Sequence, residues 1–195
     1  MARTIEAEET NSGFYCLPYN LGVSGDTAPD LVRRIDPEIK TRIYDDDSAE
    51  TYQFVFAIGV NDSVQYTKDK ANCYCNEEFL ADINLLIEKA RNFTNNISFI
   101  SPIPVDDDLL MPMKWDEEKG YSNDSVIRFV NMLKKTCQEQ DVEFFNLYEV
   151  WQAMANYKDY LIDGLHPNSA GHELMAKQIG EFLFTPEFEA FHAKC

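Results

Sequence analysis

The stretch YQFVFAI, residues 52–58, decides the fold class because it is a continuous apolar run of strand length. Such runs are typical of strands that are buried on both faces, as in a parallel sheet. The segment Gly59-Val60-Asn61-Asp62 follows directly, so polar groups stand at the predicted carboxyl end of this strand. We therefore expect an α/β protein in which functional groups lie at the carboxyl edge of a mostly parallel sheet.

Strand and helix patterns alternate on both sides of this run. Further strands are predicted over residues 15–23, 97–103 and 142–147, and a polar loop over residues 104–121. Four helices are expected: one capped by Asp26 or Thr27 with Pro29 in its first turn, one from Asn76, one from Ser122 or Asn123, and one from near Asn168. No repeat or linker interrupts the order, so we expect one domain over residues 1–195.

Composition narrows the functional classes. The chain has 195 residues, 45% hydrophobic and 26% charged, with a formal net charge of -17. A surface this acidic repels phosphates and anionic membranes, so nucleic acid and membrane partners are not expected. A neutral or cationic substrate is favoured over a polyanion.

The termini and the cysteines indicate the compartment. The N-terminus, MARTIEAEETNSG, has no apolar core of a signal peptide, and no apolar run is long enough for a membrane span. Five cysteines, an odd number, favour free thiols. We expect a cytoplasmic protein.

Three short motifs carry groups suited to acyl chemistry. NLGVSGDT, residues 20–27, has glycines that expose backbone N–H groups at a helix start. GVND offers the Asn61 amide, which can donate to a developing oxyanion. In DGLHPN, residues 163–168, Asp163 can accept the Nδ1–H of His166 and orient the ring. Taken singly, each motif can also be a plain turn.

Together and in this order, these segments resemble three conserved blocks of the SGNH hydrolases, also called GDSL esterases and lipases. The resemblance implies a three-layer α/β/α sandwich around a parallel five-stranded sheet. It also implies that Gly25 and Asn61 form an oxyanion hole, that His166 is the general base and acid, and that Asp163 orients it. The implied substrate is a small acyl or acetyl ester, with no metal and no cofactor.

The sequence departs from this family at the nucleophile. The family's Gly-Asp-Ser block, which follows its first strand, has no counterpart here. Gly25-Asp26-Thr27 looks similar, but it belongs to the second block, and Thr27 would begin a helix. We therefore expect an N-terminally shortened domain without the first strand, and a homo-oligomer is a hypothesis because the sheet edges would be open. No nucleophile is identified.

Several alternatives stay open at this point. Ser12, Ser24 and Ser63 are the candidates for a substitute nucleophile, although none lies on a recognisable nucleophile turn. The chain is then an impaired esterase, a pseudoenzyme that keeps an acyl or sugar-ester pocket, or a flavodoxin-like binding domain whose motifs are coincidental.

Other residues receive weaker hypotheses. Cys73 and Cys75 could clip a metal, but no matching ligands complete a zinc site. The acidic runs at residues 45–47 and 106–108 are expected to be solvated loop charge rather than cation sites. Trp115, Met111 and Met113 either line an acyl pocket or pack their loop onto the body.

Overall fold

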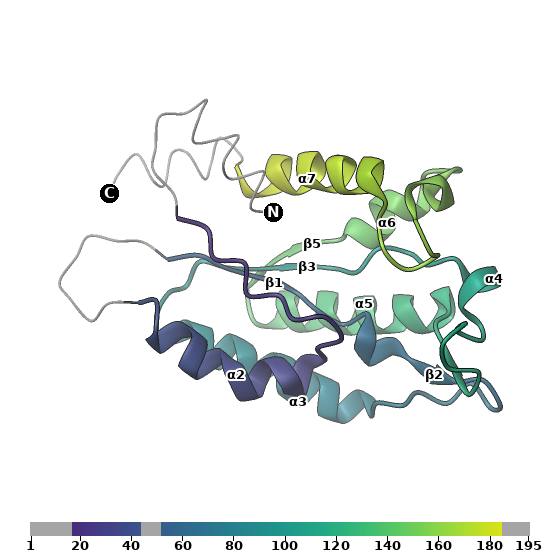
Figure 1. The fold of residues 1–195 in the computed structure, drawn as a ribbon. Helices are drawn as coiled ribbons and strands as arrows, with labels where there is room; N and C mark the ends of the chain where they lie inside the picture. The colour runs from purple at the N-terminus through teal and green to yellow at the C-terminus, as the bar shows by residue number, and fades with distance from the viewer. Residues whose placement is uncertain (1–16, 44–51, 185–195) are drawn as a thin grey trace. The chain divides into compact units, whose positions relative to one another are not determined.

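A computed structural model describes residues 17–43 and 52–184, which Figure 1 traces as a ribbon. The chain divides into two compact units: a central unit, residues 23–166, and a terminal unit made of residues 1–22 and 167–195. The central unit holds every described strand and every described helix except α7 (Ser169–Leu183). The four predicted site residues, Gly25, Asn61, Asp163 and His166, all belong to the central unit.

Three parallel strands form the main sheet of the central unit, in the order β1-β3-β5. Their bounds are Phe54–Ala57 for β1, Ile97–Ile100 for β3 and Glu143–Phe145 for β5. Helices α3 (Asn76–Arg91) and α5 (Asn123–Glu139) make the two crossovers that parallel pairing requires. All three strands end at one edge, where open parallel sheets bind their ligands.

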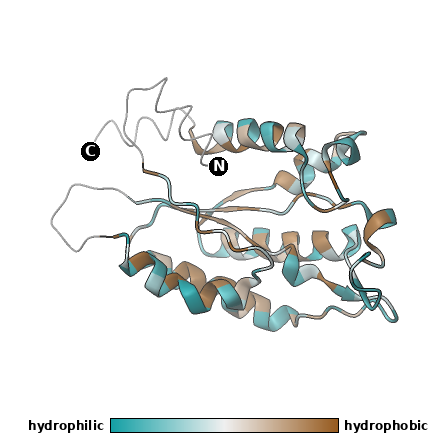
Figure 2. Cartoon of the chain, in the orientation of Figure 1, coloured by the Kyte–Doolittle hydropathy of each residue, from teal (hydrophilic) through white to brown (hydrophobic). Residues whose placement is uncertain are grey.

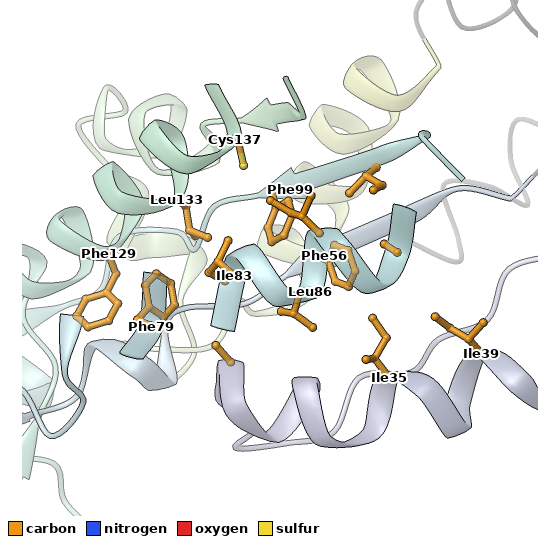
Figure 3. Close-up of a cluster of buried hydrophobic side chains, with 14 residues drawn as sticks. Ile35, Ile39, Phe56, Phe79, Ile83, Leu86, Phe99, Phe129, Leu133 and Cys137 are labelled. Atoms are coloured by element: carbon orange, nitrogen blue, oxygen red, sulfur yellow. The ribbon is translucent and has the colours of Figure 1, made fainter. Parts of the chain in front are cut away.

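Helices α2 (Ala28–Lys40), α3 and α5 cover one face of this sheet (Figure 1). Their apolar sides and the strands share one buried cluster, which is drawn in Figure 3. In this cluster the rings of Phe79 and Phe129 meet edge to face, with their centroids 4.8 Å apart. Ile35 of α2 and the strand residues Phe56 and Phe99 belong to the same cluster. Figure 2 shows polar and apolar residues sharing each of these helices, as expected where one side is buried.

Two short elements occupy the region that the sequence predicts as a loop, residues 104–121. These are α4 (Asp107–Leu110) and β4 (Lys119–Gly120), and β4 pairs antiparallel with β2 (Gln65–Tyr66). Strand β2 follows the 3-10 turn η1 (Asn61–Ser63), while α6 (Leu147–Gln152) and the 3-10 helix η2 (Tyr157–Tyr160) follow β5. The β2-β4 ribbon thus ties this loop to the segment after β1.

The helix predictions are confirmed in detail. Thr27 is the N-cap of α2, Ser122 caps α5 and Asn168 caps α7, the last two through their own side chains. The predicted apolar stripe of α3 is buried throughout, at Phe79, Ile83, Leu86, Ile87 and Ala90. One cap differs, because Cys75 is the N-cap of α3 and Asn76 is its first residue.

The prediction that the 52–58 run is buried on both faces is wrong. Only four of its residues form β1, and of these Phe56 is buried while Ala57 is exposed. The physical reason is position, since β1 pairs with β3 on one side and is an outer strand of the described sheet. Strand β3 lies between the other two, and all four of its residues are buried.

The strand predicted over residues 15–23 is also wrong for the part described, because residues 17–23 have no regular structure. Pro18 has no N–H to donate, and the Asn20 side chain accepts a hydrogen bond from the Gly22 N–H at 3.1 Å, which closes a local turn. The described main sheet therefore has three strands, where the resemblance implies five. The homo-oligomer stays a prediction.

Within the described ranges, no helix is long and apolar enough to cross a bilayer. Cys73, Cys75 and Cys137 are free thiols, whereas Cys16 and Cys195 lie outside those ranges. The described residues hold no group of three or more His, Cys, Asp or Glu side chains arranged to bind a metal ion. The acidic run at residues 45–47 lies outside the described residues.

Candidate active site

The turn before α2 presents the backbone N–H of Gly25. The turn is closed by a hydrogen bond from the Asp26 N–H to the Val23 carbonyl, 3.3 Å. Gly25 has φ +84°, a left-handed value that residues with a Cβ rarely adopt, so the turn favours glycine. Gly25 is exposed, and no described residue accepts a hydrogen bond from its N–H. A free donor therefore stands beside the N-terminus of α2, where negative charge is favoured.

Asn61 is held in one orientation by two hydrogen bonds. Its Nδ2 donates to the backbone carbonyl of Asp26 at 2.9 Å, and its Oδ1 accepts from the Tyr121 hydroxyl at 3.0 Å. A carbonyl can only accept, so the amide nitrogen must face Asp26. One N–H of the Asn61 amide is engaged in this way, and the second is left to donate elsewhere.

Asp163 and His166 form a compact acid–imidazole turn. The Oδ2 of Asp163 lies 2.8 Å from Nδ1 of His166, and its Oδ1 accepts from the backbone N–H groups of His166 and Leu165 at 2.8 and 2.9 Å. Burial opposes the ionised form, but these hydrogen bonds outweigh it and hold the pKa of Asp163 at about 2. An ionised Asp163 accepts the Nδ1–H, so Nε2 of His166 can act as a base.

The ring of His166 is open to solvent, with 63% of the side chain exposed. The turn beneath it is anchored, because the Gly164 carbonyl accepts from the Asp106 N–H at 2.8 Å. Leu165 is buried in an apolar cluster with Val105 and Tyr121. A base whose ring is exposed and whose turn is anchored can meet a substrate that approaches from solvent.

This second apolar cluster brings the two halves of the site to the same part of the central unit. It contains Leu165, which precedes His166, and Tyr121, whose hydroxyl holds Asn61. Val60, which precedes Asn61, packs against it. The segments that follow β1 and that carry the Asp163–His166 pair thus share one packing core.

Sequence reasoning missed two residues of this arrangement. The sequence places Tyr121 only at the end of a loop, and nothing in its spacing signals a hydrogen bond to Asn61. The GVND motif gives Asp62 no role, yet this residue is wholly buried and its Oδ1 accepts from the Ala28 N–H at 2.8 Å. The available signal in the sequence is an acidic residue directly after the oxyanion candidate.

The three serines considered as substitute nucleophiles lie in different surroundings. Ser63 is wholly buried and its hydroxyl donates to the Val60 carbonyl at 2.7 Å, so it is not free to attack a substrate. Ser24 is exposed in the turn beside Gly25. Ser12 lies outside the described residues.

The acidic run 106–108 is more than solvated loop charge, which corrects that expectation. Lys158 donates to Asp106 at 2.6 Å and to Asp108 at 3.0 Å, and Asp107 accepts from the Asn123 N–H at 3.0 Å. The carboxylates fasten α4 to η2 and to the start of α5, because each carboxylate accepts from a donor on a neighbouring segment.

The loop residues considered for an acyl pocket separate in the structure. Met113 is buried in the second cluster, which favours packing of the loop. Trp115 is 60% exposed, and no described contact places it at the site.

The sequence matches the GDSL-like Lipase/Acylhydrolase family over residues 8–174, so the chain belongs to this family. No curated protein sequence matches it. The fold is that of known acylhydrolases and esterases, an α/β arrangement with a mostly parallel sheet flanked by helices.

Similar solved structures support the fold assignment. A lipase/acylhydrolase from Enterococcus faecalis aligns with a TM-score of 0.68 at 17% identity, over 93% of this chain and 83% of that one. An acetyl xylan esterase aligns with a TM-score of 0.70 at 16% identity, over 94% of this chain and 89% of that one. A catalytic mutant of an acetylxylan esterase from Geobacillus stearothermophilus aligns with a TM-score of 0.66 at 18% identity, over 93% of this chain and 78% of that one.

Proposed function

We propose that this chain is a carboxylic ester hydrolase of small acyl or acetyl esters. We infer that its turnover is impaired, since no nucleophilic serine is identified. The observation that carries the proposal is the Asp163–His166 contact of 2.8 Å with an ionised Asp163, in a chain of the GDSL-like family. The free N–H of Gly25 and the second N–H of Asn61 supply donors for an oxyanion.

The roles follow from these positions. Without a serine, the reagent available to His166 is water: His166 Nε2 takes a proton as the water oxygen bonds to the ester carbonyl carbon. Asn61 and Gly25 receive the resulting oxyanion, and Asp163 stabilises the imidazolium. When the C–O bond breaks, the imidazolium returns the proton to the leaving alkoxide. Sites that keep an oxyanion hole without a nucleophile retain roughly 10³–10⁴-fold acceleration over water.

The test combines a short p-nitrophenyl ester with a fluorophosphonate probe and mass spectrometry. The proposal expects slow hydrolysis that His166→Ala lowers and that His172→Ala, at an exposed histidine of α7, leaves unchanged. A probe adduct on Ser12 or Ser24 would identify a substitute nucleophile. Hydrolysis equal in the wild type and His166→Ala would refute an esterase site.

A pseudoenzyme is the second candidate, and the serine hydroxyls favour it. Seven serines lie in the described residues, and five of them donate to protein acceptors, namely Ser63, Ser98, Ser101, Ser122 and Ser125. The other two, Ser24 and Ser169, are exposed. Binding of a short acyl ester without turnover, measured by calorimetry, would support this alternative.

A further inference from the structure

The carboxyl group of Asp62 is buried and half satisfied. The residue has no solvent exposure, its Oδ1 accepts from the Ala28 N–H at 2.8 Å, and its Oδ2 meets no donor among the described residues. Buried ionised groups usually have partners for both oxygens, because desolvation of a charge is costly. A carboxylate kept in such a place calls for an explanation.

The surroundings of Asp62 favour its neutral form. Burial is the largest cause, and the charges of Asp82 on α3 and Asp30 on α2 act in the same direction. The N–H groups of Ala28 and of Asp62 itself oppose them, and the pKa of Asp62 settles at about 6. Burial and the charge of Asp62 also raise the pKa of the Tyr121 hydroxyl, so Tyr121 lies within the electrostatic reach of Asp62.

Asp62 also joins the two segments that carry the oxyanion donors. Asn61 Nδ2 donates to the Asp26 carbonyl, and Asp62 Oδ1 accepts from the Ala28 N–H. Two neighbouring residues of η1 therefore hold the residues directly before and after Thr27. Gly25 directly precedes Asp26 in the same turn. Of the two bonds, only the one made by Asp62 has an ionisable acceptor, and charge-assisted hydrogen bonds are the stronger kind.

We propose that Asp62 is a positioning residue that, when ionised, holds the Gly25 turn against Asn61 and, when protonated, loosens it. The spacing of the two oxyanion donors then depends on pH. The assignment of Gly25 and Asn61 as oxyanion donors rests on the proposed function, but the coupling between their segments does not. No substrate or nucleophile is needed to observe it.

The experiment follows three NMR signals of the ¹⁵N-labelled full chain from pH 5 to pH 8: the backbone amides of Ala28 and Gly25 and the side-chain amide of Asn61. All three should shift with one common midpoint, near 6. In Asp62→Asn, whose side-chain oxygen can still accept from Ala28, the signals should persist and this titration should vanish.

Two further variants test whether the titration belongs to Asp62. His166 carries the imidazole of the candidate site, and His166→Ala should leave the midpoint of the three signals in place. Asp82→Asn should lower the midpoint, because a neighbouring negative charge is removed. This variant keeps Asp62 intact and stays informative if Asp62→Asn fails to fold.

The proposal is overturned if the three signals titrate unchanged in Asp62→Asn, or if their titration disappears in His166→Ala. It is equally overturned if Ala28 alone responds while Gly25 and Asn61 stay still, because Asp62 would then cap α2 without positioning the donors. Absence of ester hydrolysis would refute the proposed function and leave these signals unaffected, so the two failures are distinguishable.

Discussion

The two halves of the candidate site are built in different ways. The Asp163–His166 half is a local turn, in which one carboxylate binds groups two and three residues ahead. The oxyanion half depends on bonds across the chain, since Asn61 reaches 35 positions back to Asp26 and 60 positions ahead to Tyr121. The first half carries its geometry within its own motif, whereas the second half depends on the fold.

The halves also differ in exposure and electrostatics. Hydrogen bonds lower the pKa of Asp163 to about 2, while burial raises the pKa of Asp62 to about 6. One carboxylate is therefore a fixed charge under all ordinary conditions, and the other changes charge within the working range of many proteins. We expect the acid–base chemistry of the site to depend on Asp163, and the spacing of the Gly25 and Asn61 donors to depend on Asp62.

His166→Ala should have the largest effect on function, because it removes the only described imidazole paired with a carboxylate. General acid–base catalysis contributes about 10²–10⁴-fold, and ester hydrolysis should fall by a factor of that size. Initial rates with a p-nitrophenyl ester measure it. His172→Ala is the matched control, and equal losses in both variants would show that the assay reports general damage.

Asn61→Ala should be the next largest change, at about 10²–10³-fold in turnover, the usual cost of one oxyanion donor. The substitution also removes the bond to Asp26, so its effect is compared with Tyr121→Phe, which removes only the bond to Oδ1. Tyr121→Phe should lose much less turnover. An exposed asparagine, Asn95, provides the control substitution to alanine. Retention of full turnover in Asn61→Ala would remove this residue from the site.

This contrast explains how much could be predicted from sequence. Caps and apolar stripes are local patterns, so Thr27, Ser122 and the buried face of α3 were predicted correctly. The acid–His turn is local too, and the structure places Asp163 beside His166 as the spacing suggests. The exposed side of β1 and the bond from Tyr121 to Asn61 depend on which segments become neighbours, and no single stretch of sequence carries that information.

A pair of glycines tests the same contrast through stability. Gly164 and Gly25 both have left-handed φ values, +89° and +84°, so alanine should cost about 1–2 kcal/mol at each. At Gly164 a Cβ would lie 3.1 Å from the Cβ of Leu109, whereas nothing lies within 4 Å at Gly25. Gly164→Ala should therefore destabilise the chain more than Gly25→Ala in urea denaturation. The reverse order would show that the acid–His turn relaxes more easily than its contacts suggest.

The smallest expected effect is the pH dependence that Asp62 adds to stability. Its pKa is about 6 in the folded chain and 3.8 in its ordinary state, so the folded chain holds the proton more tightly and Asp62 stabilises it less as pH rises. Between pH 5 and pH 8, this loss is roughly 1–1.5 kcal/mol. Asp62→Asn does not titrate, so its stability relative to the wild type should rise by that amount across the interval. Urea denaturation at the two pH values measures it, with Asp124→Asn, at an exposed position of α5, as the control. Parallel pH profiles for Asp62→Asn and the wild type would mean that Asp62 stays ionised in the folded chain throughout this interval, so that its bond to Ala28 does not change with pH there.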